Sequence, residues 1–408
     1  MFGPAAGWIR PEEYAGSEEN LELVNRNFTR LVLGVQLVIA GIQLPPKYLK
    51  TEWKGLAYLL GPGMTLMWLF SSMLIWALVP DITFLYALAI GACVTPTDPV
   101  LSASIVKGKF ADKHLPRSLQ NLVIAESGAN DGLGYPFLYL PLYLIQYIGK
   151  GAYGGHSAGK SIGLWFYETW CYEILLSVAY GCVVGIVAKY LLRWATERNY
   201  VDEEEFLIFA LAMAVSACSH MHAVLLTRKI FILGTDGMIG SDDVLACFAA
   251  GNAFTWDDWF RQKTQDDSLQ PSLDLLLNVA VFIWFGAVCP WHSFNHNNVI
   301  PIYRLIPLGI AILLARRPPV LYLLHKLIHQ TERWRQATIV GFFGPIGVGA
   351  IFYLSVSQEF LRTELLNENG EEREDAARLR ETMTVVIWFL VVCSVVSHYC
   401  ADFRIHMY

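Results

Sequence analysis

The sequence predicts an all-α, polytopic membrane protein, and three observations support this. The 408 residues are 54% hydrophobic and only 16% charged, whereas a soluble chain carries about 25% charged residues. The apolar residues form blocks of the length that crosses a bilayer as a helix, about 20 residues. Lysine and arginine gather in every second connection, the largest basic loop lying at 316–335, as expected of cytoplasmic loops. Spanning segments must be helices or closed barrels, and these blocks are too long for barrel strands.

The apolar blocks predict about ten spans, one of them poorly defined. In chain order they are 28–44, 56–79, 84–106, 119–148, 174–193, an unclear region at 206–254, 273–289, 302–315, 339–357 and 384–397. Residues 1–27 are predicted to be a polar N-terminal loop, and residues 28–398 one transmembrane domain. The charged stretch at 359–381 predicts a short surface helix.

Two of these spans contain residues that interrupt a helix. In the first, Thr95, Thr97 and Asp98 lie among two prolines, Pro96 and Pro99, which remove backbone donors and clash with the preceding turn. In the second, the sequence from 344 to 349 reads Gly-Pro-Ile-Gly-Val-Gly and includes Pro345. Paired broken helices are typical of the ion site of an inverted-repeat transporter. The alternative is that both are ordinary kinks.

Acidic residues within the spans are the first candidates for function. An ionised side chain at mid-membrane costs at least about 2.5–3.5 kcal/mol, so such a residue is rare and usually functional. Asp98 lies at the first break, and Glu126, Asn130 and Asp131 lie together in the fourth span. On a helix Glu126 and Asn130 share a face, while Asp131 lies about 100° around, above Ser127.

Two further charged pairs have both a functional and a structural interpretation. Asp242 and Asp243 follow Ser241, an arrangement also typical of a helix N-terminus with a serine cap. Arg316 and Arg317 precede two prolines. One of them could be the counter-charge of the buried acids, or both could anchor the span on the cytoplasmic side.

A single desolvated carboxylate suffices for exchange chemistry. It holds either a proton or a metal cation, and each expels the other. Asp131 is the predicted Na⁺ or K⁺ ligand, with neutral oxygens offered by Asn130, Thr95, Thr97 and Ser127. Hard cations prefer such oxygen ligands. The eight cysteines show no metal-binding spacing, and we expect no cofactor and no nucleic acid, only Na⁺, K⁺, H⁺ and the lipid bilayer.

Taken together, the motifs resemble the fungal plasma-membrane Na⁺(K⁺)/H⁺ antiporters of the cation:proton antiporter superfamily. The matching segments are Thr-Pro-Thr-Asp-Pro at 95–99, Glu-Ser-Gly-Ala-Asn-Asp-Gly at 126–132, Gly-Ser-Asp-Asp at 240–243, the segment 250–260 and Gly-Phe-Phe-Gly-Pro-Ile-Gly-Val-Gly-Ala-Ile at 341–351. They cover most of the chain.

The resemblance implies an inverted-repeat fold with two crossed discontinuous helices, and export of Na⁺, often also K⁺, for H⁺ at the plasma membrane. The family's ion-site acids fall on Asp131 and Asp98. Its paired acids fall on Asp242 and Asp243, its membrane arginine on Arg316 or Arg317, and its functional histidine on His398. Dimers are common in that family, and no interface is recognisable in this sequence.

The chain departs from the family pattern at three places. The family has about two more spans before the Phe-Gly-Pro that stands here at 2–4, so we expect its beginning to be missing. Residues 216–230 interrupt what should be one span, and we predict an insertion such as a retained intron. Residues 399–408 do not match the family's continuation. An inactive, truncated membrane protein is therefore one alternative function.

The other alternative is an intramembrane aspartyl protease, which also needs two buried aspartates. Those enzymes place one aspartate in a Gly-x-Gly-Asp context and the other after a tyrosine. Neither context occurs at Asp98 or Asp131.

Overall fold

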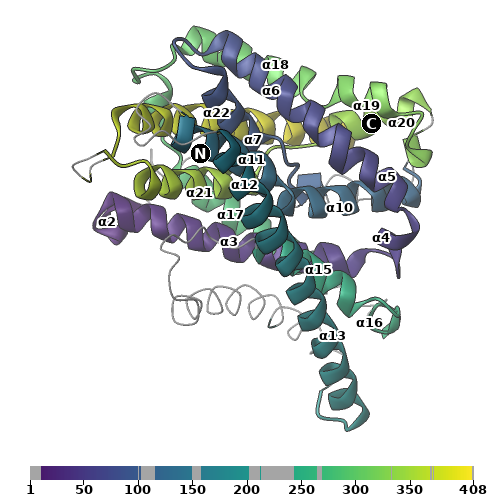
Figure 1. Cartoon of the computed structure of the whole chain (residues 1–408). Helices are drawn as coiled ribbons and strands as arrows, with labels where there is room; N and C mark the ends of the chain where they lie inside the picture. The colour runs from purple at the N-terminus through teal and green to yellow at the C-terminus, as the bar shows by residue number, and fades with distance from the viewer. Residues whose placement is uncertain are drawn as a thin grey trace. The chain divides into compact units, whose positions relative to one another are not determined.

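The computed structural model describes residues 11–99, 101–102, 115–148, 158–201, 212, 243–263, 269–331, 333–367, 370 and 372–406. Over these residues the chain is helical (Figure 1), and the only β-type pairing there is an isolated bridge between Leu366 and Glu372. The predicted all-α class is confirmed. Residues 216–230, predicted to be an insertion, lie outside the described residues.

The chain forms two compact units, each built from two separated stretches of sequence. The first unit comprises Met1–Trp53 and Trp170–Ala287, and the second comprises Lys54–Thr169 and Val288–Tyr408. Asp98, Asp131 and their neighbours all belong to the second unit.

The first unit is built on helices that pack through small residues. Its principal helices are α3 (Glu18–Gln43), α13 (Leu175–Glu197), α15 (Asp243–Phe254) and α17 (Leu269–Val288). Gly181 and Gly185 of α13 lie against the backbone of α15 at Ala246 and Ala250, where an added Cβ would collide with the carbonyl oxygens. Such close backbone approach through glycine is common between membrane helices.

The second unit contains the two interrupted spans. Its principal helices are α6 (Met64–Leu78), α7 (Phe84–Val94), α10 (Arg117–Gly132), α11 (Gly134–Ile148), α18 (Ile302–Ala315), α19 (Pro318–Leu324), α20 (Trp334–Phe342), α21 (Val348–Glu364) and α22 (Glu374–His406). Helix α7 ends just before Pro96, and the break between α20 and α21 contains Pro345. Both interruptions were predicted from the sequence.

Four helical stretches of the described chain are long and apolar enough to cross a membrane. They are Trp53–Leu78, Ala158–Glu197, Ile302–Leu324 and Glu374–His398. Shorter apolar helices include Phe84–Val94 and Leu275–Val288. The first of these is short because the break at Pro96 divides the longer span predicted at 84–106. The chain is thus a multi-pass protein by the length and composition of its helices, and the total of about ten spans stays a prediction.

Several boundaries differ from the predicted ones. Helix α3 begins at Glu18 within the predicted polar loop, with Ser17 accepting a hydrogen bond from Asn20 N as its N-terminal cap. The span expected at 174–193 starts near Ala158. The charged stretch at 359–381 is not a separate helix, because α21 continues to Glu364 and α22 starts at Glu374. Helix α22 also continues past residue 399.

Candidate ion site

The two interrupted spans are joined to each other at Asp98. The Asp98 amide donates to the carbonyl of Pro345 at 3.0 Å, and the amide of Val348 donates to Oδ2 of Asp98. The other carboxylate oxygen accepts from the amide of Leu101 at 3.3 Å. One carboxylate therefore accepts hydrogen bonds from amides of both interrupted spans, at the point where the two breaks meet (the crossing). Amides at the start of a helix lack intrahelical partners and carry positive partial charge.

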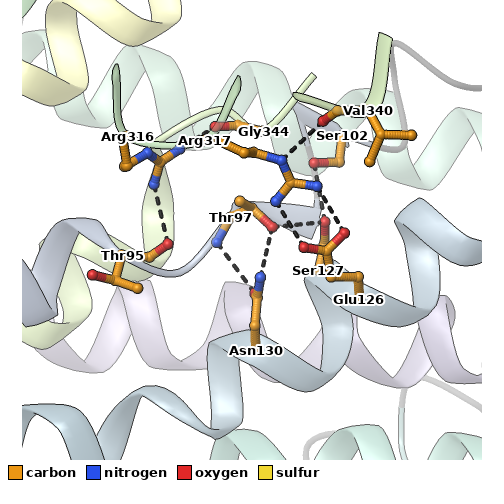
Figure 2. A network of polar contacts seen from close by, with 10 residues as sticks. All are labelled: Thr95, Thr97, Ser102, Glu126, Ser127, Asn130, Arg316, Arg317, Val340 and Gly344. Atoms are coloured by element: carbon orange, nitrogen blue, oxygen red, sulfur yellow. Dashed lines mark hydrogen bonds and ion pairs between the residues drawn. The ribbon is translucent and has the colours of Figure 1, made fainter. Parts of the chain in front are cut away.

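Helix α10 holds the unwound segment before Asp98. Asn130 accepts from the amide of Thr97 at 3.2 Å and donates to Oγ1 of Thr97 at 2.8 Å. The same Thr97 hydroxyl lies 3.0 Å from Oγ of Ser127, which contacts Oγ of Ser102 at 3.2 Å. Figure 2 shows this network. Asn130, predicted as a neutral ligand, thus fixes the position of Thr97.

Asp131, near the end of α10, is buried in the second unit, with its carboxylate against the start of α21. Its side chain is only 2% exposed, and a Cβ placed on Gly349 would lie 2.6 Å from its Oδ1. Its carbonyl accepts from the hydroxyl of Tyr353, one turn further along α21. The absence of a side chain at position 349 is therefore what leaves room for this carboxylate.

Glu126 pairs with Arg317 inside the protein. Arg317 donates to both carboxylate oxygens, at 2.8 and 2.7 Å, and the two side chains are 1% and 2% exposed. Arg317 also donates through Nε to the carbonyl of Val340 at 2.9 Å. Bidentate geometry of this kind gives the strongest charge-assisted hydrogen bonds. Arg317 thus engages both carboxylate oxygens of Glu126, and a role of Glu126 in binding the ion stays a prediction.

Arg316, the preceding residue, binds carbonyls and no carboxylate that the structure describes. Its guanidinium donates to the carbonyl oxygens of Val94, Thr95 and Pro96, where α7 ends, and to that of Gly344, where the second span breaks. The end of a helix carries negative partial charge, which a cation stabilises. The two adjacent arginines thus bind different partners. Arg317 is the counter-charge of the buried Glu126, a role that the sequence could not assign to one of the two arginines (Figure 2).

His398 and Ser394 of α22 hold the second break in place. Ser394 Oγ accepts from the amide of Ile346 at 2.8 Å. The ring of His398 lies with Nδ1 2.7 Å from the carbonyl of Ser394 and Nε2 3.0 Å from that of Phe342. The predicted histidine is therefore buried beside the break.

Three predicted residues remain. Asp242 lies outside the described residues, and Asp243 is the first residue of α15, in the first unit. The Thr95 hydroxyl donates to the carbonyl of Gly91 at 2.7 Å, so this side chain caps α7. No group of three or more histidine, cysteine, aspartate or glutamate side chains suited to a metal ion was found among the described residues.

Sequence reasoning missed Gly349, Tyr353 and Ser394. The Gly-x-Gly of the second break already indicated a close approach, but not which group approaches. Tyr353 lies four residues after Gly349 and Ser394 four before His398, so helical spacing could have placed both on the faces concerned.

Two interrupted helices that meet beside a buried acid are typical of the ion sites of inverted-repeat transporters. Residues 7–399 match the family described as sodium/hydrogen exchanger, transmembrane. The chain belongs to the sodium/hydrogen exchanger family. This confirms the resemblance read from the motifs.

Relatives of this exchanger chain agree with the assignment. It is 35% identical to Na(+)/H(+) antiporter 2 of Zygosaccharomyces rouxii, over 98% of this chain and 47% of the relative. It is 36% identical to a Na(+)/H(+) antiporter of Saccharomyces cerevisiae, over 98% of this chain and 39% of the relative. The chain thus spans less than half the length of these two relatives.

A solved structure supports the fold. The sodium proton antiporter MjNhaP1 of Methanocaldococcus jannaschii matches with a TM-score of 0.64 and 16% identity, over 99% of this exchanger chain and 89% of that chain. The chain therefore has the inverted-repeat fold of that antiporter, and its family is one of cation and proton transporters.

Proposed function

We propose that this chain is the membrane part of a secondary antiporter that exchanges Na⁺, K⁺ or both for H⁺. The observation that carries the proposal is the carboxylate of Asp131, 2% exposed, beside a crossing of two broken helices. Both the family and the names of the relatives agree with cation–proton exchange.

In this proposal Asp131 binds the transported ion and the competing proton. A carboxylate without its hydration shell is stabilised by either a proton or a cation, so the two exclude each other. Hydroxyls of Thr97 and Ser127 supply neutral oxygens near α10, and Asn130 keeps Thr97 in position. Asp98 and Arg316 stabilise the crossing on which the site is built.

We also propose a cellular location and partners for this chain. We propose a multi-pass protein of the plasma membrane that serves alkali-cation and pH homeostasis, as the resemblance to the fungal antiporters implies. Its partners are the cations, protons and the bilayer, and we propose a homodimer by analogy with the family. Asp242, Asp243 and His398 are proposed as supporting residues.

Flux in vesicles tests this function. The full chain is reconstituted, a pH gradient is imposed, and uptake of ²²Na⁺ and ⁸⁶Rb⁺ is followed. We expect proton-driven flux in the wild type and at least a tenfold loss in Asp131→Asn. The matched control is Asp81→Asn, because Asp81 lies in the same unit with its side chain 84% exposed.

Three results would contradict the proposal. Flux that persists in Asp131→Asn would remove Asp131 from the exchange. Cleavage of a membrane peptide without ion flux would support the protease alternative, and a folded wild type with neither activity would support the inactive one.

A further inference from the structure

Another buried acid lies in a membrane-spanning helix, in the part of that helix that belongs to the first unit. The span Ala158–Glu197 continues from the π-helix η2 (Trp165–Ile174) into α13. Glu173, near the end of η2, is 3% exposed, although the neighbouring Leu175 is 63% exposed. The helix therefore turns its acid inward and its leucine outward.

Ser177 lies one helical turn after Glu173, on the same side. It is 0% exposed, and its Oγ has no hydrogen-bond partner among the described residues. A buried hydroxyl without a partner destabilises the folded state. A ligand that interacts with this oxygen would remove that destabilisation.

The outer surface of the same helix is apolar. Val183, Val187 and Leu191 are 59%, 50% and 54% exposed, as expected of side chains that face lipid. The buried side continues from Glu173 and Ser177 to Gly181 and Gly185, which pack on α15. The acid and the hydroxyl thus lie on the protein-facing side of a span.

The local backbone is also unusual. Residues Trp165–Ile174 form a π-helix, a form that is rare and frequently found at functional sites. Acidic residues inside membrane spans are rare and usually mark functional sites. Glu173 and Ser177 are absent from the Asp131 site, which lies in the other unit.

We infer that Glu173 and Ser177 form a second binding site for an alkali cation in the first unit. The carboxylate supplies the charge and the hydroxyl a neutral oxygen, both of them ligands that hard cations prefer. This inference rests on the proposed function only in taking the transported ions as its ligand class.

Sodium-dependent stabilisation of the purified full chain in detergent tests the site without requiring transport. A ligand that binds only the folded state raises Tm with its concentration. Tm is measured against NaCl, with choline chloride at equal ionic strength as reference. We expect Asp131→Asn to retain part of the sodium-dependent rise, and the double variant Asp131→Asn/Glu173→Gln to lose it.

Matched variants separate binding from folding. Glu168→Gln removes the other acid of the same π-helix, which is only partly buried, and should respond to sodium as the wild type does. Ser177→Ala should need severalfold more sodium for the same rise in Tm. If Glu173→Gln does not fold, Glu173→Asp and Ser177→Ala decide the question.

Three results would overturn the inference. They are a wild type without sodium-dependent stabilisation, an Asp131→Asn variant that loses all of it, and unchanged sodium dependence in the Glu173 and Ser177 variants. Vesicle flux is recorded in parallel. Absent flux with an intact Glu173-dependent rise in Tm would contradict the proposed function and leave the cation site standing.

Discussion

The carboxylate of Asp98 accepts a hydrogen bond from the amide of Val348, 250 residues further along the chain. With the bond from the Asp98 amide to Pro345, it connects the two breaks directly. Asp98 is therefore part of the framework of the crossing, and Asp131 is the acid beside it. This division of roles leads to four predictions.

Replacing Asp98 should weaken the crossing in proportion to the bonds lost. Asp98→Ala removes the acceptor of both the Leu101 and Val348 amides, and a hydrogen bond to a charged group contributes about 1.5–3 kcal/mol. Asp98→Asn keeps one acceptor oxygen and should lose less. Thermal unfolding in detergent would give the order wild type, Asn, Ala, and equal melting of all three would contradict the capping role.

Adding one methyl group at position 349 should block the ion site without unfolding the protein. The Cβ of Gly349→Ala would lie 2.6 Å from Oδ1 of Asp131, so it takes space that a cation on this carboxylate needs. We expect at least a tenfold loss of ²²Na⁺ flux. Gly61→Ala is the control, because nothing lies within 4 Å of a Cβ there, and equal flux in both variants would refute the prediction.

Breaking the Glu126–Arg317 pair should destabilise the chain strongly. Either Glu126→Gln or Arg317→Gln leaves a buried charge without its partner, which costs about 3–5 kcal/mol. Removing both charges in Glu126→Leu/Arg317→Met should recover much of that loss. A double-mutant cycle on thermal stability measures the coupling, and strictly additive single effects would show that the pair is not coupled.

Lysine should not replace Arg316. The planar guanidinium reaches carbonyls of both breaks, whereas an ammonium is a compact point charge. Arg316→Lys should therefore keep the positive charge but lose flux severalfold. Arg304→Lys, on the exposed side of the same helix, should transport normally. Full flux in Arg316→Lys would mean that charge alone suffices.

The breaks themselves could be predicted from the sequence because proline and glycine act locally. Pro96 and Pro99 lack the backbone N–H that a helix needs, whatever surrounds that helix. The Gly- and Pro-rich segment 344–349 interrupts its helix for a similar local reason. The burial of Asp98 and Asp131 followed from the surrounding apolar blocks. These properties depend on neighbours in the sequence alone.

The partners of the buried charges could not be predicted in the same way. Glu126 and Arg317 are separated by 191 residues, and nothing local distinguishes Arg317 from Arg316. Only the packed structure brings one guanidinium to a carboxylate and the other to carbonyl groups. The sequence therefore predicted Glu126 as an ion ligand without showing that Arg317 pairs with it.

The partners of Arg316 are all main-chain oxygens, and Asp98 likewise binds main-chain amides. Every residue type carries a carbonyl, and all but proline carry an amide, so new side chains at Val94 or Val348 leave these partners in place. Deleting or inserting one residue between 94 and 98, or between 344 and 348, would instead move the oxygens and amides out of reach. The crossing is thus sensitive to segment length and tolerant of composition.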